Sequence, residues 1–272
     1  MSKLSGAVVL QGGTDLMVSI KQKGLRPSHI VSLRNLRGEL GKIKESHDGV
    51  RIGAAVTFHD LEQSAVIRKR FTALHEAVEQ IASYQIRNTA TIGGNLCNAS
   101  PAADSAPPLM VLDAKLIVRG VEGKREVPIE SFFKGPGKTA LSRSDVLTEV
   151  LIPTPAAESG ASFHKLGRRM SEDISVASAA AYLGMKSGVT AVARIALGSV
   201  APTPLRAHKA EKALVGKRLT NETILEAAFA AKEECSPITD LRAGADYRRA
   251  MVEVLTRRAI ETAFARSRSG AD

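Results

Sequence analysis

Short apolar runs and helical patterns alternate along the first half of the chain. The apolar run Ala7–Leu10 stops at the pair Gly12-Gly13, which predicts a strand that ends in a tight turn. A longer apolar run, 109–118, follows the pair Pro107-Pro108. The other elements predicted in this half are strands at 30–33 and 50–55 and helices at 60–67 and 72–82.

The second half changes from strand patterns to helical patterns. Three apolar stretches, with a turn at Ser187-Gly188 between the last two, predict an antiparallel meander. After Pro202 and Pro204, apolar residues recur at three- and four-residue spacing, which predicts helices, and Thr220 or Asn221 caps the second of them. The strands are predicted at 161–166, 174–185 and 189–200, and the helices at 206–215, 221–234 and 246–266.

A linker-like stretch separates these two halves. Residues 154–160 read TPAAESG, which is a composition typical of connecting segments. The 272-residue length also fits two domains, because domains commonly have roughly 100–200 residues. We therefore predict an α+β protein with one domain over 1–155 and a second over 161–268.

The composition is that of an ordinary globular protein. Hydrophobic residues make up 44% and charged residues 24%, so the chain can bury a sizeable core. No apolar run approaches the roughly 18 residues that a membrane-spanning helix needs. The N-terminus also lacks the basic-then-apolar order of a signal peptide. We expect a cytoplasmic protein without a membrane span.

The cysteines argue against a metal site in this chain. Cys97 and Cys235 are the only two and lie far apart, and the six histidines are scattered. An iron–sulfur cluster takes several thiolate ligands, so we expect none here. Any redox chemistry would depend on an organic cofactor. Cys97 is expected to be a small thiol packed in a buried loop.

The formal charge of +10 and the pI near 9.8 raise the question of nucleic-acid binding. Aromatic residues are only 4% of the chain and tryptophan is absent, so side chains on which bases could stack are scarce. The basic residues are spread along the sequence. We therefore expect no nucleic-acid partner and interpret the charge as a solvated basic surface, or one that faces an acidic partner subunit.

Two glycine-rich turns carry the clearest chemical signal. One is the stretch 10–16, LQGGTDL, directly after the first predicted strand, and the other is 91–96, TIGGNL. Paired glycines let successive backbone N–H groups point into one concavity and let a phosphate come close. Neither turn is GxGxxG or a P-loop, so a Rossmann site and a nucleoside triphosphatase are both poorly supported. Two such turns suggest a pyrophosphate held from both sides.

The surroundings of the second turn carry a family resemblance. The stretches 85–96 (QIRNTATIGGNL) and 98–104 (NASPAAD) closely resemble the FAD-binding medium subunit of the molybdenum hydroxylases. This is the family of xanthine dehydrogenase, carbon monoxide dehydrogenase and nicotinate dehydrogenase. The first turn is similar to that family's first FAD loop, and 163–169 and 240–243 are similar to later family segments. The resemblance implies an FAD domain of the PCMH type with two α/β subdomains, followed by an antiparallel sheet with helices.

The same resemblance implies the residues that bind FAD. Both glycine turns would hold the pyrophosphate, and Asp104 would accept hydrogen bonds from the cofactor. Leu147 would contact the flavin ring, and Lys165 would lie beside it, where a cation favours the reduced cofactor. No catalytic acid or base and no metal ligand is implied. The full set is Val9, Leu10, Gln11, Gly12, Gly13, Thr14, Asp15, Leu16, Thr91, Ile92, Gly93, Gly94, Asn95, Ser100, Asp104, Leu147 and Lys165.

Two of these assignments have structural alternatives. Asp104 is also suited to capping a helix. Lys165 is also suited to a strand edge, with its ammonium group reaching water.

The resemblance also implies partners. A large subunit would carry the molybdenum cofactor and a small subunit two [2Fe-2S] clusters, in a dimer of heterotrimers. This chain would pass the electrons through FAD to NAD+ or another acceptor. Family members usually have a further strand and helix before the first loop, whereas only Met1 to Gly6 precede the first strand here. We expect part of the first subdomain to be absent from this sequence.

Two other functions stay open at this point. One is a stand-alone FAD-dependent oxidase, which would need its own substrate pocket. The other is a basic nucleic-acid-binding or regulatory protein without flavin, which would bind nucleic acid in a salt-sensitive way.

Overall fold

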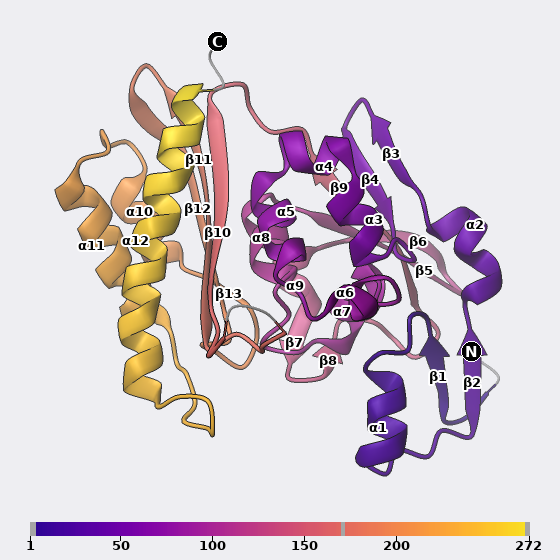
Figure 1. The fold of residues 1–272 in the computed structure, drawn as a ribbon. Helices are drawn as coiled ribbons and strands as arrows, with labels where there is room; N and C mark the ends of the chain where they lie inside the picture. Colours follow the sequence, from indigo (N-terminus) through magenta and orange to yellow (C-terminus); the bar gives the residue numbers. More distant parts are fainter. Residues whose placement is uncertain (1–3, 170–171, 270–272) are drawn as a thin grey trace.

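The first part of the chain forms a small subdomain at one end of the molecule (Figure 1). The structure is a computed structural model that describes residues 4–169 and 172–269, so Met1 to Lys3 of the N-terminal prediction lie outside it. Two parallel strands, paired from Ala7 with His29 to Leu10 with Ser32, are joined by one helix. The elements are β1 (Ala7–Leu10), α1 (Leu16–Gln22), β2 (His29–Ser32), η1 (Arg34–Leu36) and α2 (Arg37–Leu40).

The next subdomain is built on a five-stranded antiparallel sheet in the order β3-β4-β9-β5-β6. Its last strand in the chain, β9, lies in the centre, so residues 146–153 return to pair with residues 49–53. The elements are β3 (Ile43–Ser46), β4 (Gly49–Gly53), α3 (Phe58–Gln63), α4 (Ala65–Arg70), α5 (Thr72–Glu79), α6 (Tyr84–Arg87), α7 (Ile92–Asn98), α8 (Ala106–Val111), β5 (Lys115–Gly120), β6 (Gly123–Pro128), α9 (Ile129–Phe132), β7 (Phe133–Gly135), β8 (Lys138–Thr139) and β9 (Val146–Pro153).

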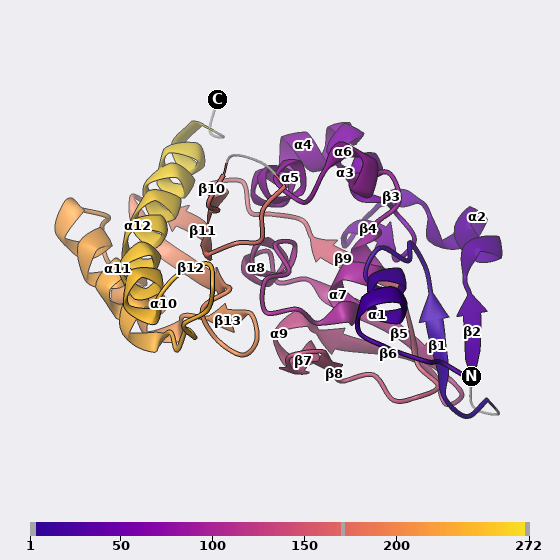
Figure 2. The same cartoon turned by 60° about the horizontal axis from the view of Figure 1, so that its bottom comes forward.

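The second half is an antiparallel sheet with three helices on its outer face (Figure 2). Helices α5 and α8 of the first half pack against its other face. Alanines at 177, 179 and 181 of the central strand belong to the outer core, and Ala180 belongs to the inner one. These small side chains let helices approach both faces. The elements are β10 (Ser159–Leu166), β11 (Ala177–Lys186), β12 (Val189–Gly198), β13 (Leu205–Arg206), α10 (His208–Leu214), α11 (Asn221–Glu234) and α12 (Ala245–Ser269).

The predicted mixed fold and the antiparallel meander are confirmed. Ser187 and Gly188 both have positive φ, 52° and 77°, as the turn between β11 and β12 requires. Helix α11 has the predicted bounds, and the Thr220 hydroxyl caps it by accepting the N–H of Thr223. The strands β1, β2, β4 and β10 lie within two residues of their predicted positions.

Other predictions of local structure are wrong. The helix expected at 60–67 is two helices, because Ser64 has extended φ and ψ of −72° and 117° and its hydroxyl caps the second helix. The helix expected at 72–82 ends at Glu79. The apolar run 109–118, for which no element type was predicted, contains the end of α8 and the start of β5, with Asp113 at a φ of 59° between them. Burial alone does not distinguish an apolar helix from an apolar strand.

A buried arginine on α12 holds the second half together. The Arg248 guanidinium donates hydrogen bonds to the carbonyl oxygens of Val176 and Ser199, at 2.6 and 3.1 Å, and pairs with Asp240 at 2.8 Å. The arginine therefore holds two points of the chain against α12, the residue just before β11 and the residue just after β12. This explains the family-like segment 240–243 as a structural motif.

We expect Arg248→Gln to lower the free energy of unfolding by roughly 3 kcal/mol, because it leaves two buried carbonyls without their donor and removes one of the two arginines that pair with Asp240. Arg249→Gln is the matched control, since in the described part of the chain the ion pair of Arg249 is with the fully exposed Asp246. Urea unfolding of both variants measures the difference. Equal effects of the two substitutions would contradict this role of Arg248.

A histidine links the two halves on another side. His208 of α10 bonds to Glu130 of α9 at 2.6 Å and to Glu211 at 3.2 Å. Partial burial lowers the pKa of His208, but the hydrogen bond that the ring donates to Glu130 and the charges of both glutamates outweigh it and raise the pKa above its usual 6.5. The contact is therefore strongest when His208 is protonated.

A histidine with a raised pKa in the folded state stabilises it below the unfolded pKa, and this contribution is lost as the pH rises through the folded value. We therefore expect His208→Gln to destabilise the protein at about pH 6 and to have little effect at about pH 9. Urea midpoints at the two pH values test this. A loss that is the same at both would show that the protonated form makes no special contribution.

Candidate cofactor site

The two glycine turns meet at a cavity of about 790 Å³. The cavity lies between the small N-terminal subdomain, the turn before α7 and the segment that leads into β9, and residues 172–174 from the second half close one side. Most of the predicted site residues are brought together here. Those that line it are Val9, Gln11, Gly12, Gly13, Thr14, Asp15, Leu16, Thr91, Gly93, Gly94, Asn95, Ser100, Asp104 and Leu147.

The first turn needs glycine at both positions. A Cβ atom on Gly12 would lie 2.2 Å from the carbonyl oxygen of Thr89, so the turn packs directly against the chain that leads into the second turn. Gly13 has a φ of +80°, which side chains disfavour. The turn then leads into α1, where the N–H of Met17 donates to the carbonyl oxygen of Gly13 at 2.9 Å.

The second turn is held by a threonine cap. Thr91 Oγ1 accepts the N–H of Gly94 at 3.1 Å and starts α7. A Cβ atom on Gly93 would lie 2.7 Å from the carbonyl oxygen of Ala54, whereas one on Gly94 would meet only the Thr91 hydroxyl, at 3.0 Å. Gly93 is therefore required by the packing of α7 on the sheet, and Gly94 faces the cavity.

Two polar side chains after this turn are oriented by local hydrogen bonds. Asn95 Oδ1 accepts the hydroxyl of the buried Ser105 at 2.6 Å, which leaves the NH2 group of Asn95 for a ligand. Ser100 Oγ accepts the N–H of Ala102 at 3.2 Å and keeps its own proton to donate. Both groups are thus donors toward the cavity.

Asp104 and Lys165 form a buried ion pair that joins the two halves of the chain. Lys165 Nζ lies 2.8 Å from Asp104 Oδ2, with the side chains 6% and 7% exposed. Lys165 Nζ also donates to the carbonyl oxygen of Gln80 at 2.9 Å, and the Ser175 hydroxyl donates to the other Asp104 oxygen. Burial raises the pKa of Asp104, against the attraction of the Lys165 ammonium. Asp104 is not a helix cap, and Lys165 does not reach water.

Three predicted residues do not line the cavity. Ile92 is fully buried in the core, and Leu10 packs beside Gly13. Lys165 lies behind Asp104, so its charge reaches the cavity only through that carboxylate. Cys97 is exposed and lines the cavity, so the expected buried thiol is wrong.

The apolar walls of the cavity were not predicted from the sequence. Phe58 lies in α3, Ile81 in the loop after α5 and Ile174 in the loop before β11, and nothing in their local pattern indicates that they converge. Ala82, which has a φ of 48°, also lines the cavity, and strained backbone of this kind is common at binding sites. In the described residues no lysine or arginine lines the cavity, so an anion in it would be held by neutral donors.

Comparison with known proteins decides the family. Residues 1–155 match the family described as the FAD binding domain in molybdopterin dehydrogenase, and residues 161–263 match the CO dehydrogenase flavoprotein C-terminal domain. The chain belongs to the FAD-binding subunits of the molybdopterin dehydrogenases. The predicted resemblance and the oxidoreductase class are thereby confirmed.

Similar proteins span nearly the whole chain. The putative xanthine dehydrogenase FAD-binding subunit of Escherichia coli K12 is 35% identical over 261 residues, which are 95% of this chain and 89% of that one. The structure of carbon monoxide dehydrogenase from Hydrogenophaga pseudoflava matches with a TM-score of 0.93 and 37% identity, over 96% of this chain and 91% of that one. Quinoline 2-oxidoreductase from Pseudomonas putida 86 matches with a TM-score of 0.89 and 31% identity, over 96% and 90%.

The cavity fits the cofactor that this family implies. The glycines let a phosphate approach both turns, and the volume lies within the roughly 300–1,000 Å³ usual for small-ligand sites. In the second turn the N–H groups of Gly93 and Gly94 are already bonded, to Ala54 O and Thr91 Oγ1, so the donors that this turn offers are side chains such as Asn95. Over residues 4–169 and 172–269 there is no group of three or more His, Cys, Asp or Glu side chains suited to a metal.

No helix in that part of the chain is both long and apolar enough to cross a membrane. The predicted boundary between the domains stays a prediction.

Gly94→Val tests the pyrophosphate cradle. The added side chain projects into the cavity and meets only the Thr91 hydroxyl, so the fold should persist while FAD affinity falls at least about a hundredfold. Gly244→Val is the control, because nothing lies within 4 Å of that position. Quenching of FAD fluorescence on titration measures both. Equal affinities would refute the two-turn site.

Lys165→Met tests the buried ion pair. It leaves the Asp104 carboxylate buried without its cation, so we expect a loss of roughly 3 kcal/mol in the free energy of unfolding. Adding Asp104→Asn should recover part of the loss, because the remaining polar group is neutral. Lys186→Met, at the exposed end of β11, is the control. A double variant that is no more stable than Lys165→Met would show that the pair is not coupled.

Proposed function

We propose that this chain is the electron-transferring FAD subunit of a molybdenum hydroxylase complex. The observation that carries the proposal is the cavity between the two glycine turns, which is lined by neutral donors and closed by the buried Asp104–Lys165 pair. The names of its relatives support the rest, since they include a carbon monoxide dehydrogenase medium chain and a nicotinate dehydrogenase FAD-subunit.

Each part of the cavity has a distinct task in this proposal. The N–H group of Gly13 binds the pyrophosphate, which comes close to the second turn because Gly94 has no side chain there. Thr14, Thr91, Asn95 and Ser100 add donors. Asp104, held by Lys165 and Ser175, accepts a hydrogen bond from the cofactor. Leu147 and the other apolar walls exclude water from the ring.

FAD, when bound, supplies the redox chemistry by accepting electrons from [2Fe-2S] clusters and delivering them to NAD+ or another acceptor. The side chains of this chain bind and orient the cofactor. None of them is assigned an acid–base role. The effect of Lys165 on the cofactor passes through Asp104, because the ammonium group lies behind that carboxylate.

The partners are part of the same proposal. A large subunit holds the molybdenum cofactor, a small subunit holds the [2Fe-2S] clusters, and the complex is a cytoplasmic dimer of heterotrimers. In the part of the chain that the structure describes, no cluster of side chains is suited to a metal, so the metal-dependent steps require other polypeptides.

Purification of the tagged chain from its native source tests the proposal. We expect two companion polypeptides, molybdenum and iron in the complex, and one FAD for each copy of this chain. Substrate oxidation should then reduce NAD+ or an artificial acceptor. A flavin-containing chain that purifies alone and oxidises a substrate itself would overturn the proposal in favour of a stand-alone oxidase.

A further inference from the structure

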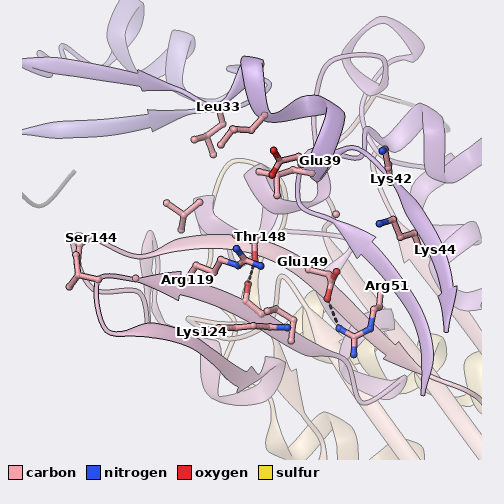
Figure 3. Close-up of a pocket in the computed structure, with 17 residues that line it drawn as sticks. Leu33, Glu39, Lys42, Lys44, Arg51, Arg119, Lys124, Ser144, Thr148 and Glu149 are labelled. Atoms are coloured by element: carbon pink, nitrogen blue, oxygen red, sulfur yellow. Dashed lines mark hydrogen bonds and ion pairs between the residues drawn. The ribbon is translucent and has the colours of Figure 1, made fainter. Parts of the chain in front are cut away.

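A second cavity, of about 500 Å³, lies over the face of the five-stranded sheet that carries Arg51, Arg119 and Thr148 (Figure 3). The segment 33–44 covers the ends of strands β4, β5 and β9 there. It shares only Leu33 and Val146 with the cofactor cavity, and none of the residues predicted to bind FAD lines it. It is therefore a separate site beside the cofactor cavity.

Its lining is strongly basic. Five cationic side chains face two carboxylates, those of Glu39 and Glu149. Arg51 is neutralised by Glu149 at 2.6 Å and by Asp48 at 2.5 Å. The other cations form no ion pair and no side-chain hydrogen bond with any residue that the structure describes; they are Lys42, Lys44, Arg119 and Lys124.

The strand register places like charges directly opposite one another in this cavity. Arg119 of β5 pairs with Lys124 of β6, and Lys44 of β3 pairs with Arg51 of β4. Like charges in such positions are destabilising. On the neighbouring part of the same hairpin, outside the cavity, Lys115 instead forms an ion pair with Glu126. Because Arg51 is neutralised, the unrelieved repulsion in the cavity is the one between Arg119 and Lys124.

The base of the cavity is apolar. Leu33 and Ile117 are buried, and other aliphatic side chains surround them beside the cations. A ligand that matches this lining has an apolar ring on the aliphatic base and anionic groups at the basic rim. The volume suits a molecule of mononucleotide size, and none of the described lining residues is aromatic, so successive bases of a nucleic-acid strand would have no ring to stack on. The further aliphatic lining residues are Leu36, Leu40, Val121 and Val146.

We propose that this cavity binds a nucleoside phosphate, with Arg119, Lys124, Lys42 and Lys44 on the phosphates and the base against Leu33 and Ile117. Guanidinium and ammonium groups are the usual phosphate ligands, and the bound anion relieves the repulsion between the paired strands. The proposal does not depend on electron transfer through FAD.

Calorimetric titration of the FAD-loaded protein with ATP tests the site. We expect one ATP per chain with no release of FAD. Arg119→Gln/Lys124→Gln should weaken ATP at least about tenfold. Lys115→Gln, on the same strand but outside the cavity, should leave the affinity unchanged. Tripolyphosphate and adenosine, titrated separately, should each bind more weakly than ATP.

The unliganded protein gives a second readout. Because Arg119→Gln/Lys124→Gln removes a like-charge pair, it should raise the urea midpoint without ligand and abolish the further stabilisation by ATP. A purely structural role of these side chains predicts a lower midpoint. The proposal is overturned if ATP displaces FAD, if the double variant binds ATP as tightly as the parent, or if tripolyphosphate binds as tightly as ATP.

Discussion

The buried ion pair between Asp104 and Lys165 is the contact on which the arrangement of the cofactor site depends. Charges removed from water are stable only when further hydrogen bonds satisfy them, and Ser175 and the Gln80 carbonyl supply these bonds. The four groups come from both halves of the chain, so the pair fixes the second half against the loop after α7. Arg248 extends the connection, because it holds Val176, the neighbour of Ser175, against α12.

The two cavities beside the central sheet offer an anion opposite kinds of lining, neutral donors in one and cations in the other. The cofactor cavity has no lysine or arginine among its described lining residues and combines two glycine turns with neutral side-chain donors such as Asn95 and Ser100. Neutral donors held in place by Gly12 and Gly93 need no countercharge and allow the close approach of an extended cofactor. The second cavity instead gathers cations from β3, β4, β5 and β6. The net charge of +10 is thus partly concentrated away from the proposed FAD site.

Local sequence patterns predicted the parts of the fold that depend on local physics. The glycine turns, the Ser187-Gly188 turn and the Thr220 cap each follow from the conformational preferences of a few neighbouring residues. Local patterns could not predict that Leu147, Ile174 and Ile81 line one cavity. Their meeting depends on β9 returning to the centre of the sheet. The opposed Arg119 and Lys124 likewise appear only when the register is known.

The central claim is that the two glycine turns hold the pyrophosphate of FAD. A crystal structure of the FAD-loaded protein tests it most directly. We expect pyrophosphate oxygens within hydrogen-bond distance of the Gly13 N–H and the Asn95 NH2 group, in contact with Gly94, and the flavin ring beside Asp104. A pyrophosphate bound at Arg119 and Lys124 in the basic cavity, or a flavin ring remote from Asp104, would contradict it.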